Sequence, residues 1–246
     1  MLAIVIFRRL SPMTTTLFKT IGAATTLAAI ALTASSANAA SLSYTSATSF
    51  QATNIIDAPL SIQKFDSALG TLNSVTLKFT GDLQGLARFE NLSPSSTPVT
   101  VNLGGQLGLK LGSQSLFSLN PTQSYNYQVG GFDGTIDFSG ASGKTVDGLM
   151  ASGTATQSFT NNSLLQAFTG TGNIDLSFSA LASSTVIGSG NFISQIQTLA
   201  KAGVEVVYDY DPVKSVPEPS AALGFGLFAG IGLLSQRKKI RLKASN

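Results

Sequence analysis

Paired carboxylates are the acid–base groups that an enzyme of this kind, without histidine and cysteine, could use, as in glycoside hydrolysis. The sequence contains no histidine and no cysteine, which removes the Ser-His-Asp triad, thiol nucleophiles and the commonest metal ligands. Twelve Asp and Glu residues remain, and two of them could act as acid and base, as in glycoside hydrolysis. No pair stands in a recognisable motif, so we predict no catalytic residues and no enzyme.

Asp133 and Asp137 are the carboxylates best spaced to bind Ca²⁺, with Asp147 or Asp175 as a third ligand. An EF-hand loop that began at Asp133 would need Asp or Asn two positions later and Glu at position 144, and the sequence has neither. On an extended strand the first two aspartates would lie about 13 Å apart, so a bent loop would be needed. We therefore predict solvated turn residues, with no metal site and no cofactor.

Tyr125 and Tyr127 lie on one face of a predicted strand and could stack against sugar rings. The chain has no tryptophan, the strongest residue for such stacking, and ordinary packing is the competing interpretation. The sequence Gly140-Ala-Ser-Gly-Lys-Thr145 is similar to half of a P-loop, but Phe138 stands where that loop requires glycine. We predict a turn there.

The segment that must position these residues reads as a series of β-strands. Its apolar and polar residues alternate with a period of two, as in half-buried strands, in residues 75–79, 99–103, 107–111, 174–178 and 204–210. Turns are predicted at Gly81-Asp82, Ser93-Pro94, Asn120-Pro121, Asp133-Gly134 and Asp147-Gly148. One short helix is expected over residues 162–168, with Asn162 or Ser163 as its N-cap. The pattern predicts an all-β fold, an antiparallel β-sandwich or jelly roll.

The net charge of +3 is a property of the two ends of the chain. Residues 40–216 carry seven basic and eleven acidic residues, whereas three bases lie in the first 39 residues and five in the last ten. A mildly acidic middle argues against a basic nucleic-acid-binding face. We predict no nucleic acid partner.

The N-terminus has the parts of a secretory signal peptide. Lys19 precedes a 14-residue apolar stretch at 21–34, which is short of the ~20 residues of a membrane-spanning helix. Ala37 and Ala39 provide the small residues before a cleavage site, which we place in front of Ala40. We expect a signal helix within residues 1–39, with Met13 as an alternative start of translation.

The C-terminus combines three features in a fixed order. A proline-rich motif is followed by an apolar stretch, expected to be a membrane helix over about 219–236, and by a basic end at 237–243. By the positive-inside rule, the bases stay in the cytoplasm and the β domain lies outside. The motif consists of Val216, Pro217, Glu218, Pro219 and Ser220, and the basic cluster of Arg237, Lys238, Lys239 and Arg241.

This tail resembles the PEP-CTERM sorting signal of Gram-negative bacteria, over about 30 residues (214–246). The resemblance implies recognition by an exosortase-type enzyme, cleavage near Pro217–Pro219, an inner-membrane precursor, and delivery to the cell surface or the exopolysaccharide matrix. A plain single-span tail anchor is the alternative.

The middle of the chain is similar to the choice-of-anchor E domain in two stretches. The first runs from Ser61 to Leu72 and contains Phe65-Asp66, and the second is Val204-Glu-Val-Val-Tyr-Asp-Tyr210. This resemblance implies a surface β domain and brings no catalytic residues.

The expected organisation is thus a signal peptide at 1–39, an extracellular β-sandwich at 40–213 and a sorting tail at 214–246. We expect a non-enzymatic surface or matrix protein. Two alternatives stay open: a carbohydrate-binding module for exopolysaccharide, which would show a Tyr-lined groove, and a polysaccharide hydrolase, which would show two carboxylates about 5–9 Å apart in a cleft.

Overall fold

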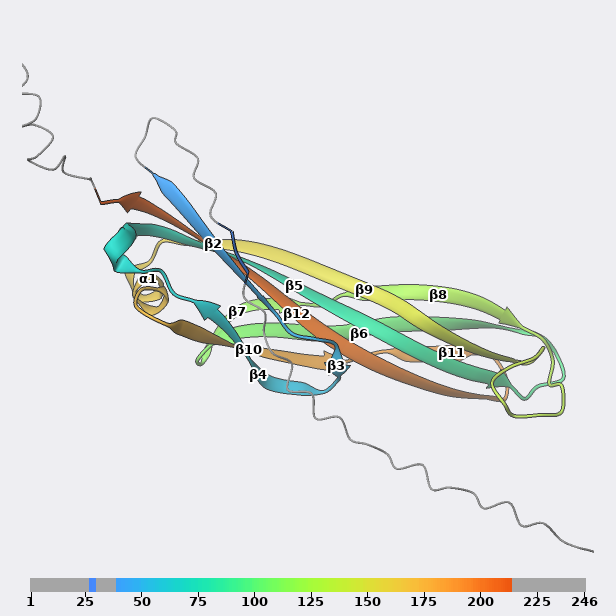
Figure 1. Cartoon of the computed structure of the whole chain (residues 1–246). Coiled ribbons are helices and arrows are strands. Elements are labelled where there is room, and N and C mark those ends of the chain that lie inside the picture. The colour runs from blue at the N-terminus through green and yellow to red at the C-terminus, as the bar shows by residue number, and fades with distance from the viewer. Residues whose placement is uncertain (1–26, 30–38, 214–246) are drawn as a thin grey trace, which may run out of the picture.

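The computed structural model of the chain describes residues 27–29 and 39–213, which form two antiparallel β-sheets (Figure 1). The expected all-β fold is confirmed. The short 3₁₀ helix η1 (Ser67–Leu69) precedes β5, and the helix α1 (Asn162–Phe168) follows β9. The strands are β1 (Leu27–Ala29), β2 (Ala40–Ala47), β3 (Gln51–Ala52), β4 (Ile55–Gln63), β5 (Gly70–Asn91), β6 (Thr97–Leu111), β7 (Gln114–Leu119), β8 (Thr122–Val129), β9 (Gly143–Phe159), β10 (Asn173–Ala182), β11 (Thr185–Gly188) and β12 (Phe192–Pro212).

The first sheet has the strand order β1-β2-β12-β5-β9, and β3 also pairs with β12. Strands β5 and β12 pair along almost their whole length, from Phe192 opposite Asn91 to Pro212 opposite Gly70. The second sheet has the order β11-β6-β10-β4, and β7 and β8 pair with β6. The long strands give the molecule the elongated shape seen in Figure 1.

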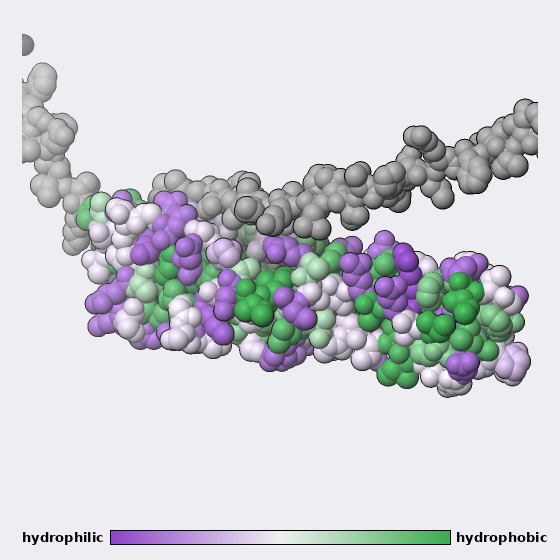
Figure 2. Space-filling view, turned by 90° about the horizontal axis from the view of Figure 1, so that it is seen from below, coloured by the Kyte–Doolittle hydropathy of each residue, from purple (hydrophilic) through white to green (hydrophobic). Residues whose placement is uncertain are grey.

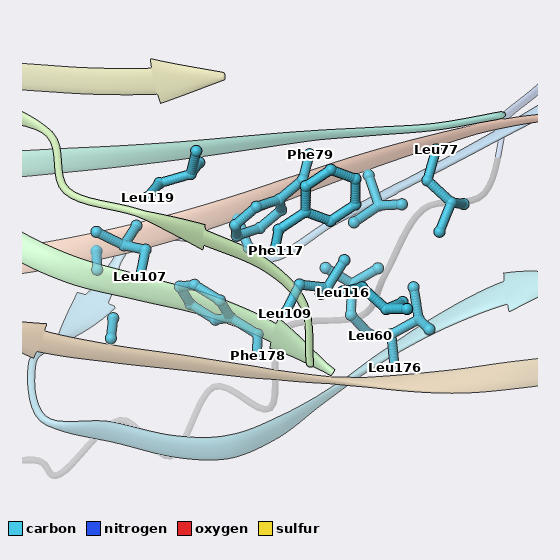
Figure 3. Packing of buried hydrophobic residues seen from close by; sticks show 14 of the residues in the cluster. Leu60, Leu77, Phe79, Leu107, Leu109, Leu116, Phe117, Leu119, Leu176 and Phe178 are labelled. Carbon is cyan, nitrogen blue, oxygen red and sulfur yellow. The ribbon is translucent and has the colours of Figure 1, made fainter. Parts of the chain in front are cut away.

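The core lies between the two sheets and follows the predicted alternation. In β5 the side chains of Val75, Leu77 and Phe79 are fully buried, while the residues between them face outward. Phe79 contacts Phe117 and Phe178 of the opposite sheet, with ring centroids 5.8 and 6.3 Å apart (Figure 3). Because each sheet contributes one apolar face, neither sheet could bury its side chains alone.

Two of the predicted turns lie inside strands instead. Gly81-Asp82 is part of the uninterrupted β5, and Asp147-Gly148 is a kink within β9, where the register with β5 shifts and Gly148 has φ of 71°. Gly81 is needed for packing rather than turning, because a Cβ there would come within 2.5 Å of Leu107 Cδ2. Ser93-Pro94 and Asp133-Gly134 lie in loops between strands, as predicted. The turn predicted at Asn120-Pro121 is wrong, because β7 and β8 on either side of it run in the same direction and both pair antiparallel with β6.

The predicted helix at Asn162–Phe168 is confirmed, but its cap lies one residue earlier than expected. Asn161 has extended backbone angles, and its side chain accepts a hydrogen bond from the N–H of Leu164 at 3.0 Å. An N-cap must precede the helical backbone angles, and Asn162 already has them.

The flanking helices are not confirmed. Of the expected signal helix, the described residues Leu27–Ala29 form the strand β1, which pairs with β2. The expected membrane helix at 219–236 lies outside the described residues. Within the ranges 27–29 and 39–213, none of the helices has the length and apolar composition needed to cross a membrane.

Both ends of the sandwich domain lie at the same end of the molecule. Ala40, the first residue of β2, pairs with Tyr210 near the end of β12. The backbone N–H of Val213 donates to Leu69 O at 3.1 Å, so η1 lies at this end too. We call this the terminal end, and we call the opposite end, made by the loops at 92–96, 130–142 and 189–191, the far end.

Candidate interaction surface

The outer face of the first sheet carries rows of polar side chains across its strands. We call this surface the polar face. It consists of Thr45 from β2, Lys201, Gly203 and Glu205 from β12, Thr76, Lys78, Thr80, Asp82, Gln84, Leu86 and Arg88 from β5, and Ser152, Thr154, Thr156 and Ser158 from β9. These residues share one face because alternate residues of a strand point to the same side of the sheet.

Hydroxyl groups bond to one another across the strands of the polar face. Thr76 Oγ1 lies 2.7 Å from Ser158 Oγ, and Thr80 Oγ1 lies 3.2 Å from Thr154 Oγ1. Ser152 Oγ donates to Asp82 Oδ1 at 2.8 Å. Such cross-strand pairs contribute modestly to sheet stability and fix the side chains in rows.

Four of the five charged residues of the polar face form two ion pairs, and Arg88 is in neither pair. Lys201 Nζ lies 3.1 Å from Asp82 Oδ2, and Lys78 Nζ lies 3.9 Å from Glu205 Oε2. The second pair is half exposed, so water and salt weaken it. The surface therefore combines hydroxyl groups with mostly compensated charges rather than charges of one sign.

A hollow of about 230 Å³ lies between these two ion pairs. It is centred on Gly203, where an added Cβ would meet nothing within 4 Å. The walls come from three neighbouring strands, and the lining residues include Thr45, Lys78, Thr80 and Glu205.

Two further hollows lie on the polar face toward the far end and share Leu86 and Gln197. Their polar lining includes Gln84, Gln195, Arg88 and Asp147. Amide groups both donate and accept hydrogen bonds, so this lining suits a ligand rich in hydroxyl groups. Each of the three hollows has at most one carboxylate, and none has the converging pair that the hydrolase alternative needs.

Tyr125 and Tyr127 lie on the same side of β8, as expected, but they pack inward and do not form a platform. The Tyr125 hydroxyl donates to Met150 O at 2.7 Å and accepts from Met150 N at 2.9 Å, so it is held against the edge of β9. The ring of Tyr127 contacts Phe89, and Lys144 Nζ lies 5.5 Å from its centroid. Burial raises the pKa of Tyr127. The Tyr-lined groove that would mark a carbohydrate module is not formed by these residues.

Asp133 organises the loop at 130–142 by accepting hydrogen bonds from its own loop. Its Oδ1 accepts from the N–H and the hydroxyl of Thr135, both at 3.2 Å, and its Oδ2 accepts from the N–H of Ala141. The N–H of Thr135, together with these other donors, lowers the pKa of Asp133, although burial acts in the opposite direction. This carboxylate has the role of a turn residue, as predicted.

The other aspartates considered for Ca²⁺ lie apart from one another. Asp137 accepts from Ser139 N at 2.9 Å, Asp147 accepts from Gly148 N at 2.7 Å, and Asp175 is exposed on β10. In the part of the chain that the structure describes, no cluster of three or more Asp or Glu residues could hold a metal ion. The half P-loop at Gly140–Thr145 is a turn that leads into β9, as predicted.

Glu90 is a buried carboxylate that the sequence pattern does not reveal. Its Oε1 accepts from Ser142 Oγ at 2.5 Å and its Oε2 from Phe138 N at 2.7 Å. The alternation of β5 predicts an outward, exposed residue at this position. Glu90 is nevertheless fully buried because the distant loop at 130–142 folds across it.

Apolar side chains gather at the far end of the molecule. Figure 2 shows hydrophobic residues concentrated toward the end at which β11 lies. The large exposed apolar residues of this end are Phe132, Ile136, Ile187 and Ile193. Asn91 holds the loops there together, since its side-chain amide donates to Ser95 O and Gly130 O, both at 2.7 Å.

Most of the predicted processing residues lie outside the described residues. Ala39 is exposed, and Ala40 begins β2. Ala37, the motif from Val216 to Ser220 and the basic cluster of Arg237, Lys238, Lys239 and Arg241 fall in the undescribed ranges.

No protein-family model and no curated protein matches the chain. One similar solved structure is that of the infectious bursal disease virus Gx strain, with 13% identity over 73% of this chain and 43% of the viral chain, at a TM-score of 0.15. Another is that of T=1 particles derived from infectious bursal virus, with 10% identity over 85% of this chain and 50% of that one, at a TM-score of 0.13. This chain therefore spans half or less of either viral chain, and at these TM-scores the likeness supports no conclusion about function.

Proposed function

We propose that the chain is a non-enzymatic protein of the cell surface or extracellular matrix, exported by residues 1–39 and sorted through its Pro-Glu-Pro tail. The observation that carries the proposal is the pairing of Ala40 with Tyr210. Both predicted targeting segments thereby join the sandwich at its terminal end. A domain attached at one end leaves its far end and its polar face accessible.

The proposed route has two steps. Signal peptidase cleaves before Ala40, and the helix at 219–236 with the bases Arg237, Lys238 and Lys239 holds the precursor in the inner membrane. An exosortase-type enzyme then recognises the motif at 216–220 and releases the domain to the surface.

Replacing Pro217, Glu218 and Pro219 by alanine tests the sorting step. The apolar stretch and the basic cluster remain, so membrane insertion should survive while the heavier precursor accumulates in the inner membrane. Immunoblots of membrane and extracellular fractions measure this, and alanines at Lys214 and Ser215, just upstream of the motif, are the matched control. Processing and release of the motif variant at the level of the parent would refute the sorting proposal and favour a plain tail anchor.

Binding of exopolysaccharide is the second candidate function. The two hollows on the polar face toward the far end favour this function, because Gln84, Gln195 and Gln197 surround the apolar Leu86 there. Sugars present hydroxyl groups and an apolar ring face, which such a lining complements. Alanine at Gln84 and Gln197 should weaken retention in affinity electrophoresis through the producer's own polysaccharide. Alanine at Gln106, exposed on the other sheet, should not.

A further inference from the structure

Strand β2 becomes the edge of the first sheet when residues 1–39 are removed. In the whole chain, β1 lies along β2 as an antiparallel strand, with Leu27 opposite Thr45 and Ala29 opposite Ser43. The predicted cleavage before Ala40 separates β1 from the domain. The edge that β1 covers is thus able to accept a strand, and processing exposes it.

Strand β9 forms the opposite edge of the same sheet, with no strand on its outer side among residues 27–29 and 39–213. Neither β2 nor the stretch 148–159 of β9 contains a charged residue or a proline. Charge, proline and bulges are the usual means of preventing edge strands from pairing. The edge strand β4 of the second sheet, in contrast, contains Asp57 and Pro59.

The β2 edge and the β9 edge lie at the same level along the strand direction. Thr45 pairs with Glu205, Glu205 with Lys78, and Lys78 with Thr156. Ala47 is connected in the same way to Thr154, through Gly203 and Thr80. If a second copy is placed beside the first with no shift along the strands, Thr45 of the first copy therefore lies opposite Thr156 of the second.

The backbone groups of the two edges are in phase for this pairing. Met150 exchanges both of its backbone hydrogen bonds with the Tyr125 hydroxyl, so its N–H and C=O point away from β5. Thr154 and Thr156, an even number of residues later, point the same way. On β2, Thr48 donates its N–H to Ala202 O of β12, so Thr45 and Ala47, an odd number of residues earlier, point outward.

The geometry points to an assembly of identical copies. We propose that, after removal of residues 1–39, the β2 edge of one copy pairs with the β9 edge of the next, which continues the first sheet from copy to copy. This inference takes from the proposed function only one step, the removal of residues 1–39. Without β1 the strand order across the sheet is β2-β12-β5-β9, and each strand is antiparallel to its neighbours, so β2 and β9 run in opposite directions.

An antiparallel junction between β2 and β9 therefore leaves all copies in the same orientation. The contact joins two different edges, β2 of one copy and β9 of the next, so it does not close after two copies. Further copies therefore add side by side into an array. Every terminal end faces the same way, which suits copies attached to one surface. Pairing of β2 with β2 of a second copy would instead produce a closed dimer with opposed terminal ends.

Cysteine cross-linking tests the proposal, because the chain has no cysteine of its own. The full chain with Thr45→Cys and Thr156→Cys, and with a specific protease site inserted after Ala39, is purified in detergent and oxidised before and after cleavage. Opposed residues lie about 5.5 Å apart, within reach of a disulfide. Within one copy the two positions are separated by three strand spacings, about 14 Å, and cannot be bridged.

We expect a ladder of dimers, trimers and longer species on non-reducing gels after cleavage. The uncleaved chain should give no ladder. Either single variant should stay monomeric, as should Thr45→Cys combined with Thr122→Cys on the second sheet. Dimers from Thr45→Cys alone would show β2–β2 pairing, and the absence of a ladder would show no pairing; each outcome overturns the proposal. Whether cells remove residues 1–39 is read separately, from the mass of the exported protein.

Discussion

At the scale of single residues, the buried polar groups distinguish this core from a purely apolar one. Glu90 and Tyr208 are fully buried and have hydrogen-bond partners, whereas the buried hydroxyl of Ser46 has none among residues 27–29 and 39–213. A buried polar group with a partner contributes to stability, and one without a partner costs free energy. Substitutions at Ser46 and Tyr208 should therefore have opposite effects.

Ser46→Ala should increase the free energy of unfolding by about 1 kcal/mol, because it removes a desolvated hydroxyl for which the described part of the chain offers no partner. Chemical denaturation of the purified protein measures this. Thr45→Ala, at the exposed neighbouring position, is the control and should change stability much less. A loss of stability in Ser46→Ala would show that the hydroxyl does have a partner in solution.

Tyr208→Phe should decrease the free energy of unfolding at pH 7 by about 1 kcal/mol, since Gln63 O loses the hydroxyl that donates to it at 2.7 Å. Burial raises the pKa of Tyr208 above its usual value of 10.0. As the pH rises above that value, the unfolded chain loses the phenolic proton and the folded chain keeps it, so stability falls.

The phenylalanine variant lacks this proton, so its stability should fall less steeply above pH 10.0 than that of the parent. Denaturation curves at a series of pH values compare the two slopes. The chain has five tyrosines and no tryptophan, so the difference in tyrosinate absorbance between the parent and the variant follows the titration of Tyr208. Identical slopes above this pH would contradict the assignment of the raised pKa to Tyr208.

At the scale of the elements, the long strands remain continuous because glycines allow close approach between the sheets. Gly81 in β5 faces Leu107 of β6, and Gly105 in β6 faces Leu83 of β5. A side chain at either position would occupy space that the opposite sheet already fills. The sequence signal of a glycine is therefore ambiguous between a turn and a packing contact.

Gly81→Ala should decrease the free energy of unfolding by about 1–3 kcal/mol, because the new methyl group overpacks against Leu107 in the core. Gly203→Ala, on the partner strand β12, is the matched control. Its methyl group would enter open space on the polar face, so we expect no loss of stability. Thermal or chemical denaturation compares the two, and equal effects would contradict the packing role of Gly81.

At the scale of the whole molecule, β5 and β12 form the centre and hold distant parts of the chain together. Strand β12 closes the first sheet by pairing with β2 and β5, which lie far earlier in the sequence. Among the residues that the structure describes, the edge strands β9 and β4 have a strand partner on one side only. Protection from solvent should therefore be greatest in the centre of the first sheet.

Hydrogen–deuterium exchange should be slowest for the amides of β5 and β12 around Phe79 and Val204, since both strands are paired on two sides there. Outward-facing amides of β9, such as that of Thr156, should exchange faster in dilute protein. Mass spectrometry of peptides from these strands measures the difference. Equal protection of β9 and β5 in the monomer would contradict the strand order.

The sequence by itself determined the class of fold and the inward-facing residues. Strand alternation has a fixed period of two, so Val75, Leu77 and Phe79 identify the core face of β5 without knowledge of any partner. The helix at Asn162–Phe168 also followed from local pattern, although its cap did not. These features depend on neighbouring residues along the chain.

The tertiary structure alone decided what depends on contacts between distant residues. The burial of Glu90 under the loop at 130–142, the inward packing of Tyr125 and Tyr127, and the passage of β5 through Gly81-Asp82 all require partners many residues away. The pairing of β2 with β12, which brings Ala40 beside Tyr210, is of the same kind. A local pattern does not identify such partners, because the fit of a strand depends on its cross-strand and same-face neighbours, which lie elsewhere in the sequence.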